Sequence, residues 1–154
     1  MKIKKFIIGI ILLALTSCGY QPIYLNKNTS NISIGKIKLE GDKNVNRKII
    51  MLIGLKENNL QKNSYNLNLK SEKKVSVIAK NKSGNASVYK TTIDVELTLR
   101  DVNDLSKIFK TKNFSLSFTY NNIENKFDLQ QYQKNIEENL IKNIGKKIET
   151  FLNI

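Results

Sequence analysis

The stretch YKTTIDVELTLR, residues 89–100, is the part of the sequence that decides the fold. Its polar and charged residues alternate strictly with a second set, which is mostly apolar. That second set consists of Tyr89, Thr91, Ile93, Val95, Leu97 and Leu99. Because successive side chains of a β-strand point to opposite faces, the stretch predicts a strand with one face in a core and the other in water.

The segments on either side predict two more strands. After the turn signal DVND at residues 101–104, the apolar positions of residues 114–120 alternate with Ser and Thr, which predicts an antiparallel hairpin. Before the stretch, the turn-rich residues 81–85 (NKSGN) follow a segment that alternates at residues 65–70 and continues unevenly to Ile78. We therefore expect three consecutive strands that form one sheet.

The outer segments complete an α+β fold. Residues 32–39 alternate with a change of phase at Gly35, which predicts a strand with a bulge or bend. Asp42 or Asn44 can cap a helix that begins near Val45, and the asparagines at 58, 59 and 63 are expected to end it. The last segment predicts a long helix with one apolar stripe, which consists of Leu129, Tyr132, Ile136, Leu140, Ile144, Ile148 and Phe151.

This order, β-α-β-β-β-α, predicts a four-stranded, mostly antiparallel sheet with two helices packed on one face. Both helical stripes then have a sheet to cover. The last helix could instead lie on a membrane, but the sheet needs a cover. We find no internal repeat, so residues 31–154 are expected to form a single domain.

The N-terminus predicts an export signal. Lysines at 2, 4 and 5 precede the apolar run at residues 6–15, which as a helix spans roughly 15 Å. That is half of the about 30 Å of bilayer hydrocarbon, so a removable signal is expected rather than a spanning helix.

The residues that follow, Leu15-Thr16-Ser17-Cys18, resemble a bacterial lipobox. The resemblance implies that residues 1–17 are removed by signal peptidase II and that Cys18 carries acyl chains, which hold the protein on a membrane. Cleavage by the ordinary peptidase is the alternative. Gly19 is not the aspartate associated with inner-membrane retention, so the outer membrane is the expected destination. Residues 18–30 then form a tether that leads to the domain.

The chain is strongly basic, with a formal net charge of +13. Removing residues 1–17 leaves 23 of the 26 basic residues against 13 acidic ones. Such a balance favours nucleic acid, a membrane surface or a phosphorylated glycolipid as partner, and export argues against nucleic acid. Many of the lysines could simply be solvated surface residues.

Few residues could carry catalytic chemistry. The chain has no His and its only Cys is Cys18, so we expect no metal site built on these ligands, no cofactor and no catalytic residues. The carboxylate pairs Asp94 with Glu96, and Glu137 with Glu138, fall on the polar sides of a strand and a helix, where charges are usual.

Several segments together resemble the LPS-assembly lipoprotein family LptE, particularly its alphaproteobacterial branch. They are the start LTSCGYQPIY (residues 15–24), the strands YKTTIDVELTLRD (89–101) and FSLSFTY (114–120), the order of the elements, and the closing helix with Tyr132 near its start. The resemblance implies a non-enzymatic outer-membrane lipoprotein that faces the periplasm. Such a protein plugs the LptD barrel in a 1:1 complex, helps it assemble and binds lipopolysaccharide on its way to the outer leaflet.

In such a role, lysines would meet the phosphates of lipid A as point charges. One candidate set lies around the turn at residues 81–85 and consists of Lys80, Lys82 and Lys90. The other lies at the opposite end of the hairpin and consists of Arg100, Lys107, Lys110 and Lys112. At most one set should face the glycolipid.

Two other functions remain open from the sequence. The protein could be a different small outer-membrane lipoprotein that binds a periplasmic protein, as an inhibitor or a barrel-assembly accessory. It could also be an enzyme that acts on cell-wall or lipid substrates through its carboxylates.

Overall fold

The computed structural model describes residues 32–58 and 64–152. They form β1 (Ser33–Gly41), α2 (Lys43–Ile53), β2 (Ser64–Lys80), β3 (Ala86–Asp101), β4 (Ile108–Asn121) and α3 (Lys126–Leu152). The signal peptide (residues 1–17), the lipobox residues Leu15, Thr16, Ser17 and Cys18, and the tether (residues 18–30) lie outside the described residues, so their prediction stays a prediction.

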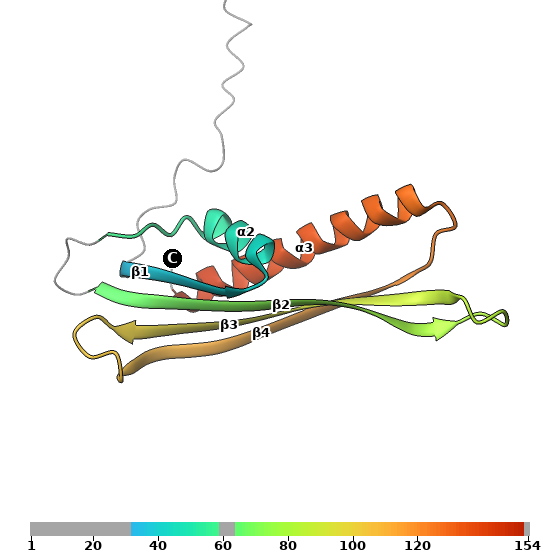
Figure 1. The fold of residues 1–154 in the computed structure, drawn as a ribbon. Helices are drawn as coiled ribbons and strands as arrows, with labels where there is room; N and C mark the ends of the chain where they lie inside the picture. Colours follow the sequence, from blue (N-terminus) through green and yellow to red (C-terminus); the bar gives the residue numbers. More distant parts are fainter. Residues whose placement is uncertain (1–31, 59–63, 153–154) are drawn as a thin grey trace, which may run out of the picture.

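The predicted fold is confirmed. The four strands form one sheet in the order β1-β2-β3-β4, in which β1 runs parallel to β2 and the other two pairs are antiparallel. Both helices lie on the same side of this sheet (Figure 1). We refer to that side as the covered face and to the opposite side as the open face. The residues at odd positions of β3 from Thr91 to Leu99 are buried under the helices, as the alternation predicted.

The connection from β1 to α2 follows the predicted local signals. A register shift between Ile34 and Ile37 marks the bulge expected at Gly35. Asp42 caps α2, because its carboxylate accepts hydrogen bonds from the backbone N–H groups of Asn44 and Val45 at 2.9 and 3.0 Å.

Two predicted boundaries are wrong. Helix α2 ends at Ile53, ahead of the asparagines that were expected to end it, because Gly54 adopts a left-handed conformation (φ 67°) and its N–H donates to Ile50 O. Strand β4 begins at Ile108 rather than at Phe114. The pairing of its first residues with β3 includes a register shift. Lys110 and Lys112 occupy covered-face positions where apolar residues would be expected, so the sequence shows no apolar alternation there.

The core lies between the sheet on one side and α2 and the C-terminal two thirds of α3 on the other. Ile136, Ile144 and Ile148 of α3 are buried in one cluster with the covered-face residues of β3, which include Ile93 and Leu97. The first turns of α3 are more open, and Phe127 is 72% exposed. Among the residues that the structure describes, no helix has both the length and the apolar content that crossing a bilayer requires.

The sheet extends well beyond β1. Strand β1 pairs with β2 only as far as Gly41 opposite Ser71. Beyond that point the sheet continues as three strands, which we call the arm: residues 72–80 of β2, 86–94 of β3 and 115–121 of β4. Figure 1 shows the arm reaching past α2, with the first half of α3 above it.

Candidate functional site

Two of the predicted basic residues meet in a groove between β4 and α3. Lys112 pairs with Leu97 and Lys110 with Leu99, so both lysines stand on the covered face of an edge strand. The groove has a volume of about 810 Å³. Its lining consists of Lys110, Lys112, Asn113, Phe114, Ser115, Lys147, Thr150 and Phe151, and we call it the lysine groove.

Aromatic rings hold the two ammonium groups of β4 in place. Phe114 and Phe151 meet edge to face, with ring centroids 6.0 Å apart. The Nζ of Lys112 lies 5.2 Å from the Phe151 centroid, and the Nζ of Lys110 lies 5.5 Å from the same centroid. Cation–π attraction of about 0.5–1 kcal/mol per exposed contact offsets part of the repulsion between the two lysines.

The third lysine of the groove comes from α3. Lys147 stands one helical turn before Phe151, so it reaches the same groove from the opposite wall. The described lining contains no Asp or Glu, which leaves three positive charges without an acidic neighbour in the lining. An anion about 4 Å from one ammonium gains about 1–4 kcal/mol, depending on how far water screens the pair. The groove can therefore bind a phosphate or another polyanion.

The other members of this predicted set do not join the groove. Lys107 lies in the loop between β3 and β4, where its backbone N–H donates to Asp104 O at 3.0 Å. The guanidinium of Arg100 donates to Leu105 O at 3.0 Å and so ties down the same loop. Sequence reasoning missed Lys147, because on the helical pattern it is one of several solvent-side lysines.

The set at the other end of the hairpin is spread out. Lys80 is the last residue of β2 and lies opposite Ala86, the first residue of β3. Lys82 lies in the turn that joins the two strands. Lys90 stands on β3 opposite Ser76, four residues from Ala86, which corresponds to about 13 Å along the strand. The two predicted sets do lie at opposite ends of the hairpin. Lys110 and Lys112 of the second set line the lysine groove, whereas Lys80, Lys82 and Lys90 are spread along the end of the arm.

The paired carboxylates of α3 have structural partners. Glu137 accepts a hydrogen bond from Lys73 of β2 at 2.9 Å and lies 3.5 Å from Lys48 of α2, while Glu138 lies 3.7 Å from Lys48. The bond to Glu137 raises the pKa of Lys73 above its usual value. These pairs connect α3 to both α2 and the sheet.

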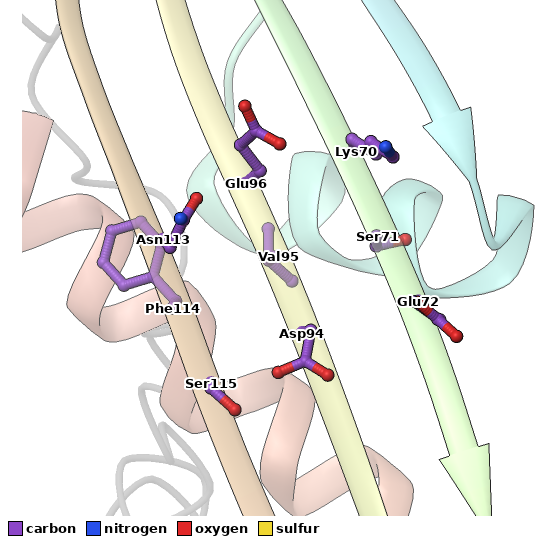
Figure 2. A pocket seen from close by; sticks show the side chains of 9 residues that line it. All are labelled: Lys70, Ser71, Glu72, Asp94, Val95, Glu96, Asn113, Phe114 and Ser115. Carbon is purple, nitrogen blue, oxygen red and sulfur yellow. The ribbon is translucent and has the colours of Figure 1, made fainter.

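The carboxylates of β3 lie on the open face. Asp94 and Glu96 line a pocket of about 320 Å³ on this face. Figure 2 shows both side chains on β3, between β2 and β4. Glu96 pairs with Lys70 across the strands, and Asp94 pairs with Glu72. All four side chains are exposed. Within residues 32–58 and 64–152, no three His, Cys, Asp or Glu side chains gather as they would to hold a metal ion.

Comparison with known proteins identifies relatives by fold rather than by sequence. No protein-family model matches the sequence, and no curated protein matches it either. Among solved structures, rare lipoprotein B from Shewanella oneidensis matches with a TM-score of 0.57 at 12% identity, over 77% of this chain and 94% of that one. An uncharacterized lipoprotein B from Nitrosomonas europaea matches with a TM-score of 0.56 at 10% identity, over 86% of this chain and 94% of that one. This chain therefore has the same fold as two bacterial proteins described as lipoprotein B.

Proposed function

We propose that this protein is a lipid-anchored outer-membrane lipoprotein of the LptE type. In this role it fills the LptD barrel in a 1:1 complex, helps the barrel assemble and assists the insertion of lipopolysaccharide into the outer leaflet. The acyl chains on Cys18 hold it at the periplasmic side of the membrane. No cofactor, metal or catalytic residue takes part.

A feature of the sequence and the fold itself support this proposal. The lipobox-like residues before Cys18 come from the sequence, and the fold shared with two proteins described as lipoprotein B comes from the structure. The order of elements that underlies the resemblance to LptE is the order observed. The lysine groove then supplies a place on this fold where a phosphorylated glycolipid can bind.

The lysine groove is the observation that carries the ligand part of the proposal. Lys110, Lys112 and Lys147 present ammonium groups, which bind phosphate as point charges and tolerate several orientations. The Phe114 and Phe151 rings beneath them offer an apolar floor. Such an open site, which tolerates several orientations of the phosphate, suits a ligand that binds briefly and moves on rather than one that stays bound. We therefore assign the lipid A phosphates to this groove and not to the set around Lys80.

The proposed role is non-enzymatic, and the carboxylates fit structural roles. Glu137 and Glu138 are engaged with lysines of α2 and β2. Asp94 and Glu96 stand exposed on the open face. Replacing all four by amides should leave barrel binding and lipopolysaccharide binding largely intact, whereas a carboxylate-dependent hydrolase would lose its activity.

The partner is tested by co-purification. The full-length protein, expressed with its own signal sequence, should co-purify with a large outer-membrane barrel in detergent at a 1:1 ratio. Recovery of the protein without a barrel would contradict the proposal. Recovery with a soluble periplasmic protein instead would favour the accessory or inhibitor alternative.

The groove is tested with two variants that remove the same charge. The Lys110→Gln, Lys112→Gln, Lys147→Gln protein should bind lipopolysaccharide at least about tenfold more weakly, because each charged hydrogen bond contributes about 1.5–3 kcal/mol. The Lys80→Gln, Lys82→Gln, Lys90→Gln protein is the matched control and should lose much less. Dephosphorylated lipopolysaccharide should remove the difference. Equal losses in both variants would show that only net charge matters.

A further inference from the structure

Strand β2 has an edge that is not paired in the arm. Beside residues 64–71 it pairs with β1, and along its whole length it pairs with β3. At Gly41 the chain turns out of the sheet into α2. No described strand therefore lies beside residues 72–80 on the β1 side.

The direction of the free backbone groups follows from one hydrogen bond. The N–H of Asp42 donates to Ser71 O at 2.9 Å, so the carbonyl of Ser71 points toward the β1 side. In an antiparallel pair, residues alternate between facing one neighbour and the other, and the β2–β3 register is regular from Ser71 to Val77. The N–H and C=O groups of Lys73, Val75 and Val77 therefore point outward.

Three apolar side chains along this edge are exposed. Val75, Val77 and Ile78 are 49%, 45% and 52% exposed. Proteins usually protect such edges with charges, prolines or a covering element, because unpaired strands recruit other strands. On the covered face, Lys73 is hydrogen-bonded to Glu137 of α3 and the next two positions are Val75 and Val77. The free charge of Lys74 stands on the open face.

A pocket lies beside this edge on the covered face. It has a volume of about 210 Å³ and lies between β2 and the first half of α3. Its lining consists of Lys73, Val75, Thr91, Gln130, Gln133, Lys134 and Glu137. A strand added next to Val75 would direct every second side chain toward this pocket.

We propose that the edge of β2 at residues 72–80 binds an extended loop segment of the partner barrel by β-augmentation, since the wall strands of a closed barrel have both edges paired. The identification of that partner rests on the proposed function. Backbone hydrogen bonds to Val75 and Val77 supply the affinity, and small apolar side chains on the covered face supply the fit. Lys74 and Lys90 stand on the open face beside this edge and form no ion pair with a described carboxylate. They favour an acidic residue on the open face of the added strand.

The direct test is hydrogen exchange of the wild-type protein, alone and in the purified complex with the barrel. The peptide that covers residues 72–80 should exchange rapidly at Val75 and Val77 in the isolated protein and at least about a hundredfold more slowly in the complex. Residues 115–121 on the opposite edge of the arm are the internal control and should change less. Unchanged exchange at residues 72–80 in an intact complex would overturn the proposal.

A matched pair of variants separates backbone pairing from side-chain contact. Val75→Pro removes one outward N–H and leaves the bonds to β3 in place, because Val75 does not donate toward β3. It should reduce barrel recovery at least about tenfold relative to wild type, while Val75→Thr, which keeps the N–H, should recover the barrel normally. Circular dichroism confirms that each variant is folded, and the exchange experiment remains decisive if Val75→Pro is not.

The remaining outcomes distinguish this proposal from the proposed function. If wild type recovers the barrel and Val75→Pro recovers it equally well, the edge is not the contact and the proposed function stands. If wild type recovers no barrel, the proposed function fails first. A concentration-dependent dimer of the isolated protein that Val75→Pro abolishes would show that a second copy of this chain, and not a loop segment of the barrel, occupies the edge.

Discussion

Replacing Gly41 by alanine tests the close approach of Gly41 to β2, at the point where the sheet changes from four strands to three. Gly41 has φ +83°, and a Cβ built on it would lie only 1.9 Å from the backbone oxygen of Ser71. Relief requires the backbone of β2 to move. Such a shift would disturb the bond from Asp42 N–H to Ser71 O and the bond from Ser71 Oγ to Asp42 O at 3.1 Å.

The magnitude follows from these two effects. The left-handed conformation costs an L-residue about 1–2 kcal/mol, of which the reduced freedom of the unfolded chain returns about 0.4–1 kcal/mol. Weakening two hydrogen bonds adds about 0.5–1.5 kcal/mol each. We therefore expect Gly41→Ala to lower the free energy of unfolding by about 3 kcal/mol.

Gly84→Ala provides the matched control. Gly84 has nearly the same φ, +81°, but nothing lies within 4 Å of its added Cβ, so only about 1 kcal/mol should be lost. Urea unfolding followed by circular dichroism measures both variants. With a slope of about 1–3 kcal/mol per molar urea, the two midpoints should differ by about 1 M. Equal midpoints would refute the close approach of Gly41 to β2.

Three further predictions concern the described contacts. Asp42→Ala removes the cap of α2 and should lower the free energy of unfolding by about 1 kcal/mol in the same assay. Tyr120→Phe leaves the buried hydroxyl of Thr91 without its partner at 3.2 Å and should cost about 1–2 kcal/mol, while a neutral result would place water at that hydroxyl. The pKa of Lys73 is raised in the folded state, so its bond to Glu137 stabilises the fold at neutral pH and is lost as pH rises past about 10.5. Wild type should lose up to about 1 kcal/mol more than Glu137→Gln between pH 9 and pH 11.5, and identical pH profiles would contradict this.

Local patterns were enough to predict the sheet and its cover. The alternation at Tyr89–Arg100 reports burial directly, because one face of β3 is covered and the other is open. The cap at Asp42 depends only on residues two and three positions away, so it is also visible in the sequence. The end of α2 was missed because a single glycine, Gly54, stops the helix by its conformation while the apolar spacing continues past it.

The candidate site was harder to predict because it depends on contacts that are distant in the chain. Lys110 and Lys112 were found as members of a basic set, but their position on the covered face depends on the register of β4 against β3. Lys147 joins them only because α3 passes along that edge. No short sequence pattern predicts the groove or the unpaired edge of β2. The groove forms because α3 passes beside β4, and the edge is unpaired because β1 ends at Gly41.

Helix α3 follows all four strands in the sequence, and this order bears on how the molecule matures. Much of the covered face stays exposed to water until α3 docks on it. The buried α3 residues that cover it are Ile136, Leu140, Ile141, Ile144, Ile148 and Leu152. Whenever the chain is delivered N-terminus first, by a ribosome or across a membrane, the sheet must wait with that face uncovered until residue 152 has emerged. A chaperone that shields apolar strands during that interval, or slow strand pairing until α3 arrives, would each raise the yield of native protein. Truncation just before α3 should therefore produce aggregates rather than a smaller folded domain.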